Sequence, residues 1–239
     1  MARDIDLEWI HGGTIEVLPT IAEGTVLTFG RDRDCSLVLE TGDRGAGAEV
    51  TDRGISRHAG SIAVDDGMVV VRNTSTTRSI ELREPTGLAS VISAGGTRAI
   101  TDLPVTLIIT GAIRRHGLRL RTDDPSPSLV SESAGPDASM TQKVPLPTAG
   151  QRSALTAMFE GYLVEFPRWD PNPATYEATG TRLGLTETAV RRRIEEYRDK
   201  LKMADIAGLE VRDARPALAQ FLLSTGIITV EDLDLLPRR

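Results

Sequence analysis

Arginine, serine and threonine side chains mark the positions at which this sequence could do chemistry. Residues 1–122 contain 14 arginines and no lysine, together with 16 aspartates and glutamates. A guanidinium group presents paired N–H donors, so this composition suits the recognition of oxyanions. A genome rich in G and C would favour arginine codons and give the same composition, and the count alone does not separate these two explanations.

Residues that could support catalysis are few. The three histidines, His11, His58 and His116, have no cysteine or carboxylate at metal-ligand spacing around them. Neither of the common glycine-rich phosphate loops is present. The single cysteine, Cys35, stands beside an apolar run and is expected to be a buried packing residue. We therefore expect no catalytic residue, no metal, no cofactor and no enzymatic activity.

The composition is that of a globular protein, and a reducing cytoplasm is its simplest expected location. Of its 239 residues, 40% are hydrophobic and only 4% aromatic, so the cores must be mainly aliphatic. One cysteine excludes an internal disulfide, and with no signal sequence and no apolar run near 18 residues we expect a cytoplasmic protein without a membrane partner. The net charge is −6, and residues 149–239 carry 13 Lys and Arg against 14 Asp and Glu. Strong non-specific binding to nucleic acid is therefore not expected.

Short apolar or alternating runs, separated by Gly, Asp, Asn and Pro, fill the first 122 residues. The clearest hairpin signal is Asp65-Asp66-Gly67, which lies between two such runs. Many short strands without a long helical pattern predict an all-β sandwich over residues 1–122. The expected strands are 25–29, 36–39, 61–64, 68–72, 79–82, 91–92, 98–100, 105–110 and 117–121.

The composition changes twice after this segment, which predicts a multidomain chain. Residues 123–148 are rich in Ser, Thr, Pro and Asp and nearly free of large apolar side chains, so we expect a flexible linker. Residues 149–239 then show helical periodicity and predict an all-α domain. The expected helices are 155–166, 173–183, 187–203 and 213–224, with a further short one within 227–236.

Three short motifs in residues 27–82 resemble those of the forkhead-associated (FHA) family. Gly30-Arg31 follows a strand, as in the family's "GR" motif. Ser56-Arg57 precedes the next apolar strand, as in its "SR" motif. Residues 70–77 match the strand and loop that the family reads as "D-x-x-S-T-N-G". Their order and spacing within an all-β segment make residues 7–122 similar to an FHA β-sandwich.

This resemblance implies a phosphothreonine-peptide reader. A phosphate dianion offers three strong acceptor oxygens, which hydroxyl, amide and guanidinium donors on rigid loops can satisfy. The resemblance implies that Ser56 and Thr76 donate hydroxyl groups and that Arg57 adds charge. Arg31 would bind the phosphate or the peptide backbone, and Thr77 stands where the family holds the peptide backbone with an asparagine.

Two positions depart from the family pattern. The family's Asn-Gly falls on Thr77-Arg78, and a threonine side chain cannot reproduce both hydrogen bonds of an amide. The family's buttressing histidine falls on Ala59, with His58 one position earlier. We expect either a weaker affinity or an atypical ligand.

Residues 176–202 resemble a helix-turn-helix, closest to region 4 of sigma factors. Gly184 supplies a residue that tolerates positive φ at the turn, and Leu185 would fill the angle between the helices. The resemblance implies that Thr188, Arg191 and Arg192, early in the second helix, reach the major groove of DNA.

The exposed face of that second helix also fits a purely solvated role. It carries three acids, Glu195, Glu196 and Asp199, which would repel DNA. Arg191–Glu195 and Arg192–Glu196 have the spacing of ordinary i,i+4 ion pairs. Docking of a protein partner is therefore an alternative to DNA contact.

The sequence leads to one functional hypothesis and two alternatives. The first is a phosphothreonine-binding regulatory protein in bacterial Ser/Thr-kinase signalling, coupled to transcription through the helix-turn-helix. Its partners would be a phosphothreonine-containing protein, a Ser/Thr protein kinase and DNA. The second is an adaptor whose helical half docks a protein and does not bind DNA. The third is an FHA fold that has lost phosphate recognition and serves only as structure.

Overall fold

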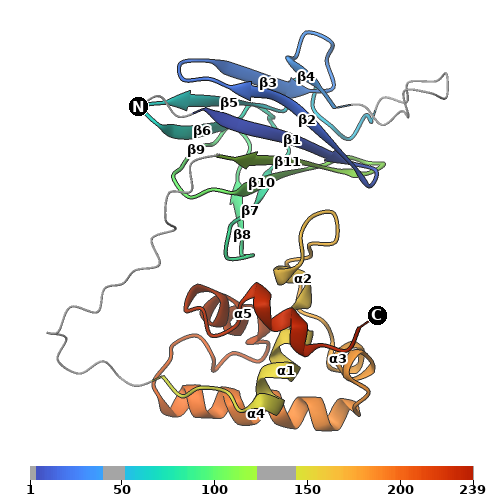
Figure 1. Cartoon of the computed structure of the whole chain (residues 1–239), viewed down its shortest axis with the longest axis vertical. Coiled ribbons are helices and arrows are strands. Elements are labelled where there is room, and N and C mark those ends of the chain that lie inside the picture. The colour runs from blue at the N-terminus through green and yellow to red at the C-terminus, as the bar shows by residue number, and fades with distance from the viewer. Residues whose placement is uncertain (1–3, 40–51, 123–143, 239) are drawn as a thin grey trace, which may run out of the picture. The chain divides into compact units, whose positions relative to one another are not determined.

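The computed structural model describes residues 4–39, 52–122 and 144–238. They form two compact units, one built of strands and one of helices (Figure 1). No helix in these described ranges has the length and apolar character needed to cross a membrane.

The strand unit consists of two sheets, and the predicted all-β fold of this segment is confirmed. Its described residues place β2, β1, β11, β10, β7 and β8 in one sheet and β4, β3, β5, β6 and β9 in the other, in these spatial orders (Figure 1). Within both sheets the neighbours pair antiparallel, except for the parallel pair β3 and β4. The strands are β1 (Ile5–His11), β2 (Thr14–Ile21), β3 (Val26–Gly30), β4 (Leu37–Val38), β5 (Gly60–Asp65), β6 (Met68–Asn73), β7 (Ile80–Arg83), β8 (Ala89–Ile92), β9 (Thr97–Ile100), β10 (Val105–Thr110) and β11 (Arg115–Arg121).

A mainly aliphatic core fills the strand unit. Alternate residues of each strand point to opposite faces, so Ile62 and Val64 of β5 are buried while the alternating Ser61 and Ala63 are partly exposed. Both sheets contribute to one cluster of buried side chains, in which Trp9 and Phe29 are the aromatic members. The scarcity of aromatic residues in the sequence is thus reflected in the core.

Nine of the strands match predicted ones within a few residues, and the hairpin of β1 and β2 was not predicted. Residues Ile5, Leu7 and Trp9 alternate into the core. The turn uses Gly12 and Gly13, with φ values of 53° and 85°. In contrast, the turn between β5 and β6 was predicted, and its Asp66 and Gly67 have positive φ as such tight hairpins require.

The described helical unit contains five α-helices and one 3₁₀-helix. The prediction for 187–203 is confirmed at both ends, and its buried stripe of Val190, Ile194, Tyr197 and Leu201 is the predicted one. The helices are α1 (Ala149–Met158), α2 (Glu160–Leu163), α3 (Tyr176–Leu183), α4 (Glu187–Met203), α5 (Arg215–Ser224) and the 3₁₀-helix η1 (Val230–Leu235).

The start of α1 differs from the prediction because a capping box fixes it. The Thr148 hydroxyl accepts the Gln151 N–H, and the Gln151 side chain accepts the Thr148 N–H. Two residues expected in the linker contact the helical unit instead: Val144 packs against the helical core, and the Pro145 carbonyl accepts the Tyr197 hydroxyl at 2.9 Å. The remainder of the predicted linker, 123–143, lies outside the described residues.

The other helix boundaries also follow local caps. The first predicted helix, 155–166, is divided at Phe159 into α1 and α2. The second begins at Tyr176 and not near Pro173, because the Thr175 hydroxyl caps it by accepting the Ala178 N–H.

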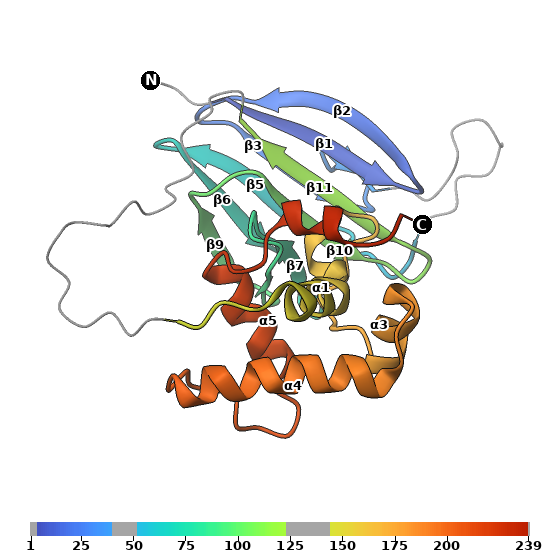
Figure 2. The same cartoon turned by 60° about the horizontal axis from the view of Figure 1, so that its bottom comes forward.

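A three-residue turn joins α3 to α4 (Figure 2). Gly184 ends α3 in the left-handed region, at φ 66° and ψ 31°. The Leu185 N–H then bonds to the Gly180 carbonyl at 2.9 Å, and the Thr186 hydroxyl caps α4. A Cβ on Gly180 would lie 2.7 Å from the Leu185 carbonyl oxygen, so this close helix–turn approach depends on glycine.

Candidate functional site

The strand register brings three loops together at one end of strands β3, β5 and β6. Phe29 at the end of β3 pairs with Gly60 at the start of β5, and Gly60 pairs with Asn73 at the end of β6. The β3–β4 loop, the segment that precedes β5 and the β6–β7 loop therefore begin or end side by side. These loops carry Arg31, Ser56 with Arg57, and Thr76 with Thr77, respectively.

Backbone hydrogen bonds join the first loop to the second. The Arg31 N–H donates to the Ser56 carbonyl at 3.1 Å, and the Asp32 N–H donates to the Arg57 carbonyl at 3.0 Å. Gly30 makes this approach feasible, because a Cβ there would lie 2.1 Å from the Arg57 carbonyl oxygen. The glycine of the "GR" motif is thus a packing requirement of the site.

Side-chain hydroxyl groups join the second loop to the third. The Ser56 hydroxyl donates to Ser75 Oγ at 2.8 Å. A second bond joins the same loops, because the Thr74 hydroxyl donates to the His58 carbonyl at 2.9 Å. Ser75 is buried, whereas Ser56 is only partly so.

Asn73 holds the third loop in shape. Its buried side-chain amide nitrogen lies 2.8 Å from the Arg78 carbonyl and 3.0 Å from the Ile92 carbonyl, and its Oδ1 accepts the Ser75 N–H at 3.0 Å. These bonds connect both ends of the β6–β7 loop to β8, so Thr76 and Thr77 lie on a constrained loop.

Asp52 anchors the second loop to the turn between β10 and β11. Its buried carboxylate accepts N–H groups from Gly54 and Ala112 at 2.8 Å, from Ile113 at 2.9 Å and from Arg114 at 3.4 Å. Burial by itself raises the pKa of Asp52, but these backbone donors outweigh it and hold the pKa below its ordinary value. Asp52 is therefore ionised, and it ties the chain four residues before Ser56 to the β10–β11 turn.

The five predicted residues thus lie on three joined loops, with different exposure. Arg57, Thr76 and Thr77 are exposed, and Arg31 and Ser56 are partly buried. The Arg31 Nε is buried and meets no hydrogen-bond acceptor within the described parts of the chain. Hydroxyl and guanidinium donors on constrained loops can bind an oxyanion.

Cys35 does not add a nucleophile to this region. Its Sγ lies 3.4 Å from the Arg57 carbonyl and 3.5 Å from His58 Nδ1. Burial, together with the nearby Asp32, raises the pKa of the thiol. The thiol is therefore neutral and packs beside the loops, as the sequence predicted.

Sequence reasoning did not identify Ser75, Asn73 or Asp52 as parts of the site. Ser75 and Asn73 lie inside the motif that was compared with the FHA family, and their burial was the missing information. The partners of Asp52 at 112–114 are about 60 residues away in sequence, so no local signal marked it.

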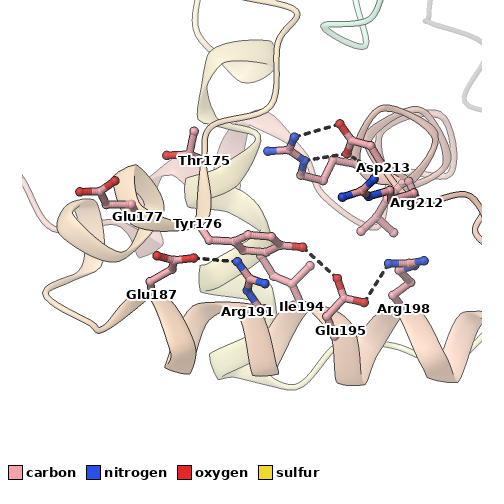
Figure 3. A pocket seen from close by; sticks show the side chains of 13 residues that line it. Thr175, Tyr176, Glu177, Glu187, Arg191, Ile194, Glu195, Arg198, Arg212 and Asp213 are labelled. Carbon is pink, nitrogen blue, oxygen red and sulfur yellow. Dashed lines mark hydrogen bonds and ion pairs between the residues drawn. The ribbon is translucent and has the colours of Figure 1, made fainter.

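The residues predicted to contact DNA lie in the first turns of α4. Thr188 is exposed, and the Arg192 side chain is 73% exposed with its Nε 3.7 Å from Glu196 Oε1. Arg191 bonds to Glu187 at 2.7 Å, and its guanidinium stacks on the Tyr176 ring at 4.8 Å from the centroid (Figure 3). The Arg191 side chain is therefore occupied on the side of α4 that faces α3.

The predicted pair Arg191–Glu195 does not form. Glu195 accepts the Tyr176 hydroxyl at 2.9 Å and the Arg198 guanidinium at 2.8 Å instead (Figure 3). The reason is geometric: Arg191 turns toward Glu187 one helical turn earlier, where the helix N-terminus also favours the acid.

These side chains line a polar pocket of about 460 Å³ between α3, α4 and the start of α5 (Figure 3). Arg215 also lines the pocket, and its guanidinium binds Asp213 through two hydrogen bonds of 2.7 and 2.9 Å. Most of the arginines of the pocket thus have a carboxylate partner. The described residues also contain no cluster of three or more His, Cys, Asp or Glu that could hold a metal ion.

No protein-family model matches the chain. No curated protein matches it either.

Solved structures are similar to about half of the chain. The FHA domain of MEK1 is 19% identical, with a TM-score of 0.37, and the match covers 50% of this chain and 89% of that one. An FHA domain studied for phosphothreonine-dependent interactions is 17% identical (TM-score 0.31; 49% and 95% covered). FHA-1 of Rv1747 from Mycobacterium tuberculosis is 16% identical (TM-score 0.30; 49% and 96% covered). All three of these similar structures are FHA domains.

Proposed function

We propose that the strand unit is an FHA domain that binds a phosphothreonine-containing protein, the product of a Ser/Thr protein kinase. The observation that carries this proposal is the set of hydrogen bonds that join the loops of Arg31, Ser56 and Thr76 at the ends of their strands. These residues come from three separate motifs, and the bonds connect the loops that carry them.

The chemistry of the loops fits a phosphorylated side chain. Ser56 and Thr76 offer hydroxyl donors, and Arg57 offers an exposed guanidinium. The buried Arg31 Nε, which has no acceptor in the described chain, gains one when an oxyanion binds. Charge-assisted hydrogen bonds of this kind are the strong ones in proteins.

This site offers the peptide backbone fewer hydrogen bonds than the family pattern does. Thr77 replaces the asparagine amide, and Arg78 adds a cation where the family has glycine. The phosphate therefore supplies a larger share of the binding free energy, and Arg78 favours an acidic ligand.

A titration of the full chain with degenerate phosphothreonine, phosphoserine and unphosphorylated peptide libraries tests this function. We expect binding only with phosphate, with a preference for phosphothreonine, and a loss of tenfold or more in Arg31→Ala and in Ser56→Ala. Arg121→Ala is the matched control, because this arginine is 55% exposed and pairs with Glu8 at the other end of β11 from the 111–114 turn. Binding that is indifferent to phosphate would refute the proposal.

For the helical unit, we propose that it binds a second partner, for which there are two candidates, DNA and a protein. The turn between α3 and α4 supports the helix-turn-helix resemblance, and through it transcriptional coupling by contacts of Thr188, Arg191 and Arg192 with DNA. The engagement of Arg191 by Glu187 and Tyr176 favours the second candidate, a protein-docking adaptor, because a committed guanidinium is less available to DNA.

A further inference from the structure

Ser75 has a buried hydroxyl that the proposed ligand does not reach. Ser75 is only 3% exposed. Its Oγ lies 3.0 Å from the Arg78 N, 3.4 Å from the Thr77 N and 2.8 Å from Ser56 Oγ. Every one of these neighbours is on, or adjacent to, a predicted phosphate-binding loop.

The capacity of a hydroxyl group limits how these contacts combine. A serine hydroxyl has two lone pairs to accept with and one proton to donate. Two backbone N–H groups, from Arg78 and Thr77, can fill both lone pairs of Ser75 Oγ. When both lone pairs are filled, Ser75 Oγ can no longer accept from Ser56, and its own proton is left to donate to Ser56 Oγ, which lies 2.8 Å away.

In the unliganded structure the bond between the two serines runs the other way, with Ser56 donating to Ser75. A phosphate oxygen carries negative charge and accepts more strongly than a neutral hydroxyl. Rotation of two O–H bonds is enough to redirect the Ser56 proton to the phosphate and the Ser75 proton to Ser56. No covalent bond changes.

We propose that Ser75 is a positioning residue for phosphate recognition, the middle member of a relay from the Arg78 N–H through Ser75 and Ser56 to a phosphate oxygen. This inference rests on the proposed function. Its role is to fix Ser56 Oγ in place and to polarise its O–H bond, since each hydrogen bond in a chain strengthens the next. Ser75 itself does not touch the ligand.

Thr74 provides an internal control for this role. Its hydroxyl joins the same two loops, but it donates to the His58 carbonyl at 2.9 Å and not to Ser56. If Ser75 merely braced the loops, removal of either hydroxyl would have a similar effect on binding. The relay predicts that only the loss of Ser75 acts through Ser56.

The test is a double-mutant cycle on the full chain with one phosphothreonine peptide selected from the library. We expect Ser75→Ala to weaken binding by about tenfold, and Thr74→Val by less than about threefold. In a Ser56→Ala background, Ser75→Ala should cost almost nothing more, because the relay has already lost its last member. An undiminished tenfold loss in that background, or equal losses from Ser75→Ala and Thr74→Val, would overturn the relay.

Ser75→Thr keeps the test decisive even where the alanine variant unfolds. It retains the hydroxyl and is expected to bind within about threefold of the wild type when thermal unfolding shows it folded. A folded Ser75→Thr variant with a tenfold loss would contradict the relay.

The outcomes also separate this inference from the proposed function. If the wild type binds no phosphopeptide, both fail. If the wild type binds and Ser56→Ala abolishes binding, while Ser75→Ala behaves like Thr74→Val, only the relay fails.

Discussion

His116 on β11 is a fully buried residue whose two ring nitrogens have no hydrogen-bond partner within the described residues. It stacks on Trp9 at a centroid distance of 6.0 Å. Burial lowers the pKa of His116 to about 4; the charge of Asp52 opposes this shift, and His11 and Arg114 add to it. A cation at this position would be desolvated, which is why the folded protein keeps the ring neutral.

This depressed pKa predicts an acid-sensitive strand unit. Above pH 6.5 the ring is neutral in both the folded and the unfolded chain, so it has no effect on stability. Between pH 6.5 and about 4 only the unfolded chain takes up the proton, and the free energy of unfolding falls by about 3 kcal/mol in all. We expect about 2 kcal/mol of this loss between pH 7.5 and pH 5, measured by urea denaturation of the full chain.

The matched variants are His116→Phe and His58→Gln. Phenylalanine fills the same space without a titrating group, so its unfolding free energy should change less between the two pH values. His58 is exposed, and its replacement should leave the pH dependence as in the wild type. An undiminished pH dependence in His116→Phe would show that other groups cause it.

At the scale of residues, the sequence could predict the candidate donors but not what supports them. Arg31, Ser56 and Thr76 stand in short motifs whose order is visible in the chain. Ser75 and Asp52 act through contacts that only the folded chain creates, 19 residues away for Ser75 and about 60 for Asp52. Burial of these two side chains follows from the pairing of distant strands, which residue types alone do not encode.

Elements with strong local signals could be predicted well. The bounds of α4 follow from the Thr186 cap and from apolar residues at helical spacing, both readable from neighbouring positions. β10 (Val105–Thr110) consists of β-branched residues and one leucine, and it was predicted with its observed ends.

The elements that escaped prediction have weaker or competing signals. β2 is an edge strand with mostly exposed residues and contains Pro19, which lowers its strand character. Its partner β1 has a clear alternation of Ile5, Leu7 and Trp9, so this strand could have been found from the sequence. α1 begins early because Thr148 and Gln151 form a capping box within a segment of linker-like composition.

An ion pair joins the first helix of the helical unit to its last element. Arg152 on α1 binds Asp232 in η1 through Nε at 2.6 Å and Nη2 at 2.9 Å. The Asp232 side chain is 8% exposed and also accepts the Thr229 N–H. Burial raises the pKa of Asp232, but the bonds from Arg152 and Thr229 outweigh it and the pKa is lowered.

Replacement of Arg152 should therefore destabilise the helical unit. Arg152→Met leaves the Asp232 carboxylate buried without its cation, which we expect to cost about 2–3 kcal/mol, less than for a fully buried pair because Arg152 is partly exposed. Thermal unfolding of the full chain measures this loss. Asp232→Asn in the same background should recover part of it, since it removes the unpaired charge.

Arg192→Met is the matched control for this prediction. Its pair with Glu196 is exposed on both sides, and we expect a change within about 0.5 kcal/mol. Equal effects of the two arginine replacements would mean that burial does not decide the strength of these pairs.

At the scale of the whole molecule, the protein carries a net charge of −6 yet is proposed to bind a phosphorylated ligand. Local arrangement resolves this conflict, because charge-assisted hydrogen bonds act over a few ångströms while the remote charges are screened by salt. A single phosphate needs only a few fixed donors. DNA presents a continuous row of phosphates and needs a surplus of cations over a large surface.

This difference predicts that the full chain will not bind duplex DNA at physiological salt. Residues 149–239 have 13 cations against 14 anions, and Arg191 and Arg192 both have carboxylate partners on α4. In a fluorescence anisotropy titration with a mixed-sequence duplex we expect no saturable binding at 0.15 M salt, a condition near physiological ionic strength. Arg192→Ala should change nothing.

The opposite result would have a recognisable form. Binding through a helix-turn-helix would show an apparent affinity that falls steeply with salt, because each phosphate contact releases counterions. Arg192→Ala would then weaken binding and reduce that slope by about one. Such a slope would establish DNA as the partner of the helical unit and would displace the adaptor. If the anisotropy does not change with added DNA while the same chain binds phosphopeptide, docking of a protein partner remains the proposed role of the helical unit.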